Sequence, residues 1–389
     1  MKESVGGTSV AVQVMKAVRA KVLYDGVSSK RDVYVSFDGS VRSVSERKPD
    51  CEIVSEGYVT PAFIDGHSHI GMVRAGEPSA EDESNEQMDS IYPLVNALDS
   101  VYMDDHAFEE SVENGVLYSV VLPGSGNPIG GKSVLIKNYE QNIDRAYMQD
   151  IGIKAALGYN PRSTTEWKGK RPTTRMGAVA LLRENLTKAR KAANLIRLGK
   201  KTPDEIEPLE EVFMNILDGK YRLMVHLHKE DDAFVLMQLK DEFGFRAVLN
   251  HGIDIHHEDV FRKVSAAGIP LIYGPLDTHP YKVELKHESW RNTEKVLNSG
   301  IKFCMMSDHP VILQRNIFYT MRHFMRFGMN REDVISKLTS QPADILGIKS
   351  LGKIADGYAA SFSVWNDDPF LISSHPKMVF ADGRTVYED

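Results

Sequence analysis

The sequence predicts an α/β fold: a (β/α)8 TIM-like barrel with a small β-sandwich domain built from both ends of the chain. Three observations lead to this prediction. Short alternating strands occur near both ends of the 389-residue chain, eight longer apolar runs lie between them, and helical patterns separate most of these runs. Such alternation over residues 61–349 matches the usual size of a barrel of this kind, on the order of 250 residues or more.

Composition and charge exclude several classes of protein. With 42% hydrophobic and 26% charged residues, the chain has the composition of an ordinary globular protein and not of a disordered one. A formal net charge of −7 argues against nucleic acid as the main partner. Because no apolar run reaches about eighteen residues, neither a transmembrane helix nor a membrane partner is expected. Only two cysteines are present, so we expect a reducing, cytoplasmic setting.

The two ends of the chain are expected to form one small β-sandwich domain, residues 15–60 with 350–389. Residues 16–58 contain short alternating strands separated by turn residues, and the pattern returns after residue 357. Chain termini commonly lie close together on a domain surface, so the two sets of strands can pair. Met15 begins a more regular stretch, and residues 1–14 are expected to be a flexible extension.

The central region, residues 61–349, is expected to form the barrel. Eight apolar runs are interpreted as buried parallel strands: 59–65, 116–122, 133–137, 151–157, 221–227, 246–250, 269–273 and 301–307. Helical patterns lie between most of them: 107–114, 176–198, 231–243, 257–267, 288–299 and 331–346. A doubly wound sheet is the competing arrangement, and the positions of the histidines favour the barrel.

Histidines and one aspartate follow the ends of four predicted strands. The first strand runs into PAFIDGHSH (61–69), which places His67 and His69 on one face because alternate strand residues share a face. Barrel enzymes carry their chemistry at the C-terminal ends of strands, and imidazole with carboxylate is the ligand set of a catalytic divalent-metal site. Taken singly, each histidine is more often a satisfied core or surface residue; together at one rim they predict a metal site. The other members are His226 and His228 after the fifth strand, His251 after the sixth, and Asp308 after the eighth.

These segments resemble the amidohydrolase superfamily over nearly the whole chain, and within it the imidazolonepropionase-like branch. The resemblance is carried by PAFIDGHSH (61–69), GSGNPIGG (124–131), HLHKEDD (226–232), LNHG (249–252), SDHPV (307–311), QPADILGI (341–348) and GKIADGYAASFSVWNDDP (352–369). It implies a distorted barrel with a small β-sandwich from both termini. It also implies hydrolysis of C–N bonds, usually amides or cyclic amides, by metal-activated water.

Carried over residue by residue, the resemblance implies a role for each side chain. His67, His69 and Asp308 would bind the first ion. With one ion, His226 would complete the site and His251 would polarise the substrate carbonyl; with two, His226 and His251 would hold the second ion. Asp308 would take a proton from the attacking water and return it to the leaving nitrogen. The expected metal is zinc, with iron or manganese as alternatives.

One departure from the family pattern leaves the number of ions open. Relatives commonly carry a glutamate where this chain has Tyr159, whose phenol is a poor ligand at neutral pH because its pKa is about 10. Lys154 on the same strand is a candidate bridging ligand in carbamylated form, and an ordinary lysine is the alternative. We therefore expect a mononuclear site or a weakened second site. Tyr159 and His228 are assigned to substrate binding, with a hydrogen-bonding role behind the ligands as the alternative for His228.

Two charged blocks follow strand ends and are candidate lids. Residues 77–110 contain eleven acidic residues and no basic one, whereas residues 162–201 contain twelve basic and two acidic residues. The basic block would attract anionic substrates or dock on the acidic loop, and two solvated surfaces are the alternative. GSGNPIGG (124–131) lacks the spacing of a phosphate-binding loop and is interpreted as a turn that lets the backbone approach the pocket.

The sequence therefore predicts a cytoplasmic, metal-dependent hydrolase that cleaves a non-peptide C–N bond of a small molecule, cyclic amides included. One alternative is an Xaa-Pro-type dipeptidase of the same superfamily. Another is a non-catalytic relative that serves as an oligomeric scaffold. A homo-oligomer is expected.

Overall fold

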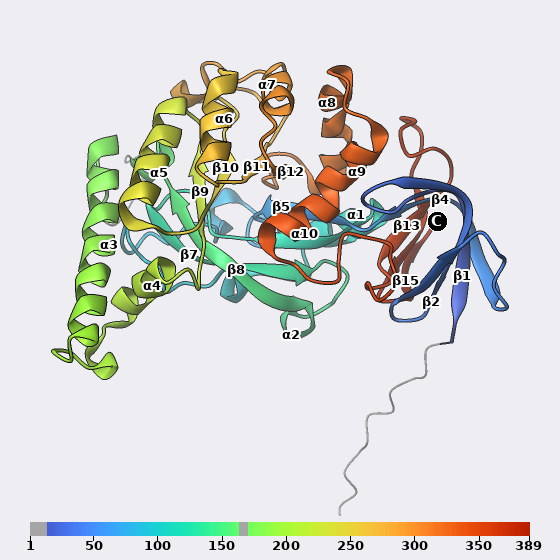
Figure 1. The fold of residues 1–389 in the computed structure, drawn as a ribbon, viewed down its shortest axis with the longest axis horizontal. Coiled ribbons are helices and arrows are strands. Elements are labelled where there is room, and N and C mark those ends of the chain that lie inside the picture. Colours follow the sequence, from blue (N-terminus) through green and yellow to red (C-terminus); the bar gives the residue numbers. More distant parts are fainter. Residues whose placement is uncertain (1–13, 163–169) are drawn as a thin grey trace, which may run out of the picture. The chain divides into compact units, whose positions relative to one another are not determined.

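The computed structural model describes residues 14–162 and 170–389, and the chain divides into two compact units. One unit contains the described residues up to 61 together with 353–389, and the other contains residues 62–352 (Figure 1). Of the predicted flexible extension, residues 1–13 lie outside the described residues, as do residues 163–169 of the basic block.

The terminal unit is built from strands of both chain ends. Its strands are β1 (Lys16–Tyr24), β2 (Ser29–Phe37), β3 (Val41–Ser45), β4 (Glu52–Pro61), β13 (Phe362–Trp365), β14 (Pro376–Ala381) and β15 (Arg384–Glu388). They form one hydrogen-bonded sheet in the order β15-β14-β13-β4-β1-β2-β3, and in Figure 1 the blue and red strands lie side by side. β1 and β4 are parallel, and the other neighbours are antiparallel.

This terminal sheet is curled so that its two halves share a core. Strands β2 and β13 are separated by β1 and β4 in the sheet order, a distance of about 14 Å in a flat sheet. The rings of Phe37 and Phe362 nevertheless have centroids 5.0 Å apart, and Phe380 packs against both. The two halves of the sheet therefore pack against each other, although the hydrogen bonding of the described strands is continuous.

The second unit contains a nearly closed barrel of eight strands. They are β5 (Phe63–Ser68), β6 (Val116–Val121), β7 (Ile129–Lys137), β8 (Tyr147–Ala156), β9 (Leu223–Leu227), β10 (Ala247–His251), β11 (Leu271–Tyr273) and β12 (Phe303–Met305), paired in sequential order. The sheet ends meet at the rim, where the Asp308 N–H donates to the His67 carbonyl at 3.0 Å and the His69 N–H donates to the His309 carbonyl at 3.0 Å. These bonds place the segments after β5 and β12 next to each other.

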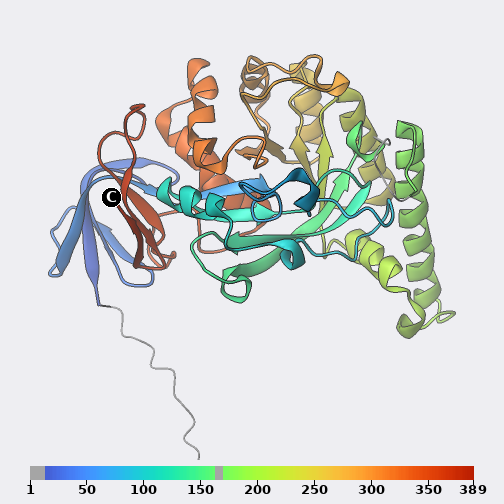
Figure 2. The same ribbon diagram turned by 180° about the vertical axis from the view of Figure 1, so that it is seen from behind.

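Two details of the predicted barrel are wrong. The strand predicted over 59–65 is split, because β4 ends at Pro61 in the terminal sheet and β5 begins at Phe63 in the barrel. Strand β7 is antiparallel to both β6 and β8. Only seven residues connect β6 to β7, from 122 to 128, whereas a parallel crossover needs about a dozen or more. The barrel is thus a nearly closed sheet of eight strands that departs from the regular (β/α)8 arrangement at β7, and Figure 2 shows the β7–β8 hairpin in teal to green.

Helices follow most of the remaining barrel strands. They are α1 (His106–Glu113), α2 (Ile143–Ala146), α3 (Arg175–Arg197), α4 (Pro208–Leu217), α5 (Glu230–Phe243), α6 (Glu258–Ala266), α7 (Asn292–Ser299), α8 (Arg322–Arg326), α9 (Arg331–Leu338) and α10 (Ser340–Leu346). The longest, α3, begins where the Thr174 side chain accepts from the Gly177 N–H, and it buries one stripe of small and aliphatic side chains. None of the helices in the described ranges is both long and apolar enough to cross a bilayer.

Strand β5 carries the first predicted ligands, and its packing requires a glycine. A Cβ on Gly66 would lie 2.9 Å from both the Ile272 side chain and the Met305 carbonyl oxygen. The residue before His67 therefore lies against β11 and β12 with no room for a side chain. This close approach fixes the end of β5 at the rim of the barrel.

Candidate metal centre

Three predicted ligands meet where β5 and β12 end. The Nε2 atoms of His67 and His69 lie 3.2 and 3.3 Å from the same Asp308 oxygen, Oδ1. His67 is fully buried, whereas His69 and Asp308 keep a small exposed fraction. Potential ligand atoms of these three residues all lie within 4.8 Å of one another. They form a first cluster that matches the donor set of a divalent-metal site.

Three further histidines form a second cluster beside the first. His226 lies on β9, His228 follows it, and His251 ends β10. Their ring centroids are 4.3 to 4.9 Å apart, and the His251 ring is also 4.8 Å from that of His67. The sequence analysis gave His228 a substrate-binding role, but the structure also groups its ring with the potential ligands His226 and His251.

Two of the imidazoles are oriented by main-chain carbonyl groups. His69 Nδ1 lies 2.7 Å from the Leu122 carbonyl oxygen, and His251 Nδ1 lies 3.0 Å from that of Gly274. We assign the ring proton to Nδ1 in each case, because a carbonyl oxygen only accepts hydrogen bonds. The lone pair of Nε2 then points into the site, which is the usual arrangement of a metal-ligating histidine.

Lys154 on β8 lies between the two clusters. Its Nζ is 3.3 Å from His67 Nε2, and its ammonium also lowers the pKa of His226, His228 and His251. The side chain is fully buried, and this burial lowers the lysine pKa to about 7. A buried amine with so low a pKa is partly neutral at physiological pH.

The chemistry of these donors fits a divalent metal. Burial lowers the pKa of both His67 and His228 to about 3, so their rings are neutral at pH 7 and keep a lone pair for coordination. His251 Nε2 and His228 Nδ1 are buried without a hydrogen-bond partner among the described residues. Buried polar atoms without partners are rare, and a bound ion is one of their ordinary explanations.

Asp308 is ionised and held in a strained backbone conformation. Burial alone would raise its pKa, but the surrounding His251, His67 and His69 outweigh this and hold the pKa well below its usual range. Its φ is 52° and that of His251 is 78°, in the left-handed region that residues other than glycine rarely adopt. Two strained residues at one rim, each costing of the order of 1–3 kcal/mol, are typical of a functional site.

Asp65 does not face the metal cluster but holds the rim together. Its Oδ1 accepts from the backbone N–H groups of His67, at 3.2 Å, and Ser307, at 3.0 Å. Its Oδ2 accepts from the Ser307 hydroxyl and from Gln314 Nε2. Burial raises the Asp65 pKa to about 6 despite these bonds. This carboxylate therefore joins β5 to the segment that carries Asp308.

A cavity of about 300 Å³ opens above both clusters. Its floor includes His69, His226, His228 and Asp308, while His67, Lys154 and His251 lie deeper. Among the described residues its walls include Asp82, Ser84, Asn85, Ser125, Asn160, Thr278, Tyr281 and Lys282. This volume is at the lower end of the range for small-molecule sites.

The segment after β8 contributes a different residue from the one expected. Tyr159 is 36% exposed, stacks with Arg162 and is not among the described residues that line the cavity. Its neighbour Asn160 does line it, with Nδ2 3.3 Å from His226 Nε2 and 2.6 Å from Ser125 Oγ. Asn160 was not among the predicted site residues, although it lies next to Tyr159 in the sequence.

Two charged residues from the loop after β11 were also missed. Glu284 is buried, accepts from the Tyr159 N–H at 2.9 Å, and has Oε1 4.0 Å from His228 Nε2. Lys282 Nζ lies 3.9 Å from the same Glu284 oxygen and lines the cavity. Burial raises the Glu284 pKa. No motif in YKVEL (281–285) indicates these positions. The fold of the loop, and not a local sequence pattern, brings Lys282 and Glu284 to the site.

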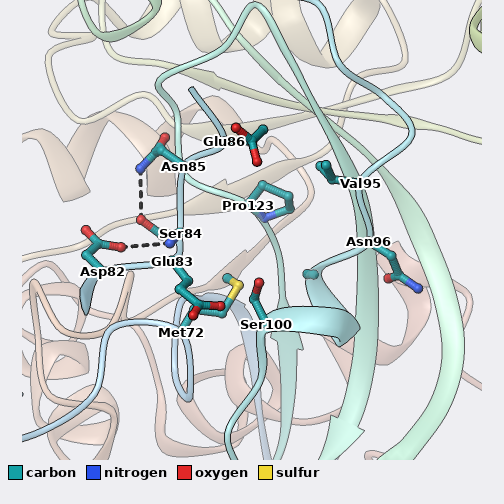
Figure 3. A pocket seen from close by; sticks show the side chains of 11 residues that line it. Met72, Asp82, Glu83, Ser84, Asn85, Glu86, Val95, Asn96, Ser100 and Pro123 are labelled. Atoms are coloured by element: carbon teal, nitrogen blue, oxygen red, sulfur yellow. Dashed lines mark hydrogen bonds between the residues drawn. The ribbon is translucent and has the colours of Figure 1, made fainter. Parts of the chain in front are cut away.

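The acidic loop is fastened to the glycine-rich turn. Asn85 Oδ1 accepts from the Gly126 N–H at 2.7 Å, and Asn127 Nδ2 donates to the Asp89 carbonyl at 2.7 Å. A Cβ on Gly124 would lie 2.3 Å from Asn85 Nδ2, so the turn needs glycine for the close approach of this loop. A second hollow of about 280 Å³ lies here. Figure 3 shows side chains that line it, among them carboxylates of the acidic loop and Pro123.

The described part of the basic block makes fixed contacts beside the cavity. Arg171 donates to the carbonyl oxygens of Gly126 and of Asn160, the latter at 2.9 Å, and Arg175 pairs with Asp232 through Nη2 and Oδ1 at 2.6 Å. The Lys170 carbonyl accepts from Ser90 Oγ of the acidic loop. Both arginines therefore bond to the protein itself, which favours docking over attraction of anionic substrates.

Comparison with known proteins identifies the family. The amidohydrolase family model matches residues 210–386. The amidohydrolase tasK of Hapsidospora irregularis is 24% identical over 388 residues, covering 90% of this chain, which spans 39% of the length of that relative. The crystal structure of a Xaa-Pro dipeptidase with bound methionine is similar in fold, with 13% identity, a TM-score of 0.61 and coverage of 97% of this chain and 100% of that one.

A more similar solved structure extends the match along the chain. The crystal structure of an amidohydrolase from Thermotoga maritima MSB8 has 31% identity and a TM-score of 0.88, and the match covers 96% of this chain and 100% of that one. The match therefore extends over both units. The chain belongs to the amidohydrolase family.

Proposed function

We propose that this protein is a zinc-dependent hydrolase that cleaves a non-peptide amide C–N bond of a small molecule, cyclic amides included. The observation that carries the proposal is the arrangement of two ligand clusters around Lys154, beneath a cavity of about 300 Å³. Membership of the amidohydrolase family supports a hydrolase acting on C–N bonds.

The geometry favours two ions over one. His67, His69 and Asp308 would hold the first ion, and His226, His228 and His251 would hold the second. With its Nδ1 proton donated to the Gly274 carbonyl, neutral His251 has no proton on Nε2 to donate to a substrate carbonyl. Burial lowers its pKa well below the usual value, so the charged form that could donate is disfavoured. His251 therefore fits the role of ligand better than that of carbonyl polariser.

The chain's own residues move the protons of hydrolysis. When bound at this site, a divalent metal would lower the pKa of water and polarise the scissile carbonyl. Asp308 is ionised, lines the cavity and accepts the proton of the attacking water. The same carboxyl then delivers that proton to the leaving nitrogen. His69 holds its orientation through the Leu122 carbonyl, which keeps Nε2 directed at Asp308 Oδ1.

Replacing Asp308 with Asn tests the catalytic role. We expect kcat to fall by on the order of 10²–10⁴-fold, because the amide cannot accept the proton, while the fold is retained. Activity is measured on a panel of cyclic ureas, imidazolones and linear amides, with metal content determined in parallel. Asp356→Asn, on an exposed turn of the terminal unit, serves as the matched control. Full turnover in Asp308→Asn would contradict the proposed mechanism.

A dipeptidase is the second candidate, because the cavity wall carries both signs of charge. The Lys282 ammonium and the Asp82 carboxylate line the same cavity and complement the carboxylate and amino group of a dipeptide. Xaa-Pro dipeptides tested beside cyclic amides separate the two candidates through kcat/KM. A higher kcat/KM for the dipeptides would replace the first proposal with the second.

Setting and assembly complete the proposal. We propose a cytoplasmic protein that forms a homo-oligomer and has neither nucleic acid nor a membrane as a partner. Cys51 and Cys304 are both free thiols, which agrees with a reducing compartment. Sedimentation velocity measures the assembly, and a monomer at micromolar concentration would contradict it. A non-catalytic scaffold would be supported instead by a folded chain that binds no divalent metal.

A further inference from the structure

A third group of imidazoles and carboxylates lies outside the catalytic cavity. Potential ligand atoms of Asp254, His256 and His287 lie within 4.8 Å of one another, and Glu230 and His257 form a second such triad around the same His256. Asp254, His256 and His257 lie between β10 and α6, whereas His287 lies between the 3₁₀ helix η5 (Val283–Leu285) and α7. None of these residues lines the cavity above the two clusters.

We propose that Asp254, His256 and His287 form a peripheral site for a divalent transition-metal ion of the zinc class. Two imidazoles and one carboxylate are a donor set that zinc, cobalt and nickel accept, with a solvent-exposed position left for water. The Asp254 side chain is 3% exposed, and that of His287 is 42% exposed. One ligand is therefore anchored in the protein while the site stays open to solvent.

The apo geometry is close to that of a bound site. Ligand atoms around a tetrahedral ion at 2.0–2.1 Å are about 3.3 Å apart. His287 Nδ1 lies 3.5 Å from Asp254 Oδ2, close to that separation and longer than a good hydrogen bond. The rings of His256 and His287 lie close together, with centroids 4.2 Å apart and their planes tilted by 32°.

The backbone already orients two of the three ligands. Asp254 Oδ1 accepts from the His287 N–H at 2.5 Å, which leaves Oδ2 for another partner. His256 Nδ1 lies 3.0 Å from the Asp254 carbonyl oxygen, so its Nε2 keeps a lone pair for the ion. In the second triad, both carboxylate oxygens of Glu230 lie 3.0 Å from His257 Nδ1, which is the geometry of an ordinary ion pair. For this reason we assign the ion to the first triad.

An ion here would join two rim loops. The loop of His287 also carries Tyr281, Lys282 and Leu285 of the cavity wall, and the loop of His256 follows directly on His251. Binding would therefore stabilise the wall without contributing a ligand to the reaction. We therefore expect metal binding at this site to raise Tm without changing the reaction in the catalytic centre.

Metal stoichiometry tests this site. We expect the wild-type protein, dialysed against zinc and analysed for bound metal, to hold one ion per chain more than His256→Ala or His287→Ala. His257→Ala, whose side chain lies beside the triad but outside it, is the matched control and should bind as much as wild type. Equal metal content in wild type and His256→Ala would show that the peripheral site does not exist. If His257→Ala lost the ion while His287→Ala retained it, the assignment of the ion to Asp254, His256 and His287 would be wrong.

A second measurement avoids the variants. Diethyl pyrocarbonate labels accessible imidazoles, and peptide mass mapping reports each histidine separately. Added zinc should protect His256 and His287 several-fold while leaving the exposed His106 labelled. Equal labelling of His256 and His287 with and without zinc would overturn the proposal even if a variant misfolds.

Discussion

At the scale of single residues, the site depends on hydrogen-bond partners that orient the potential metal ligands. His69 and His251 are directed by main-chain carbonyls, and Asp308 is held in the left-handed region beside them. The ligands are therefore specified by their surroundings as much as by their own side chains.

Lys154 provides the residue-scale prediction. We expect zinc to bind at the second cluster only when bicarbonate is present, because a carbamate formed on Nζ would join the two clusters. Lys154→Gln should lose this second ion and show no bicarbonate effect. Metal content determined with and without bicarbonate measures the occupancy of the second cluster. Lys132→Gln on neighbouring β7 is the control. Two bound ions in Lys154→Gln combined with His256→Ala, which removes the peripheral site, would assign Lys154 as an ordinary buried lysine.

The sequence could predict the ligand positions but not all their neighbours. His67, His69, His226, His251 and Asp308 were predicted because each lies at or just beyond the end of a recognisable apolar strand. Glu284 and Lys282 were not, because they lie in a long loop with no periodic pattern. Their positions depend on how the loop after β11 folds back over β9, which is a tertiary property.

At the scale of elements, the barrel departs from regular alternation where a helix is missing. The sequence shows no helical pattern between β6 and β7, and the short connection forces an antiparallel hairpin. A connection this short, without a helix, indicates an antiparallel pair and not the parallel strands predicted from the apolar runs. The split of the 59–65 run has a local reason as well, since Pro61 ends the hydrogen bonding of β4.

The Asp65 contacts give the element-scale prediction. Asp65→Ala leaves the N–H groups of His67 and Ser307 without their acceptor, so we expect the free energy of unfolding to fall by about 1–3 kcal/mol or more. Asp65→Asn keeps one oxygen for these donors, so its free energy of unfolding should fall by less. Urea unfolding measures both variants. An unchanged midpoint in Asp65→Ala would show that this junction does not stabilise the barrel.

At the scale of the whole molecule, the buried histidines make stability depend on pH. The pKa of His67 and of His228 is about 3 in the folded protein and 6.5 as the ordinary value. Between these values the unfolded chain binds more protons, so the stability of the metal-free protein falls as the pH drops from 6.5 towards 3. Asp65 opposes this trend, because its pKa is raised from 3.8 to about 6.

Removing one histidine should flatten this acid dependence. Each histidine contributes a slope of up to about 1.4 kcal/mol per pH unit, so His228→Asn should lower the slope between pH 6 and pH 4 by close to that amount. Urea unfolding of the metal-free protein at several pH values measures the slope. His106→Asn, an exposed histidine on α1, is the control. The same slope in His228→Asn as in wild type would contradict the burial argument.

Metal content per chain tests the central claim most directly. In a His256→Ala background, which removes the peripheral site, we expect about two divalent ions per chain at saturating zinc and bicarbonate. His67→Ala introduced into that background should lose at least one of them. A folded protein that retains no divalent metal under these conditions would contradict the account.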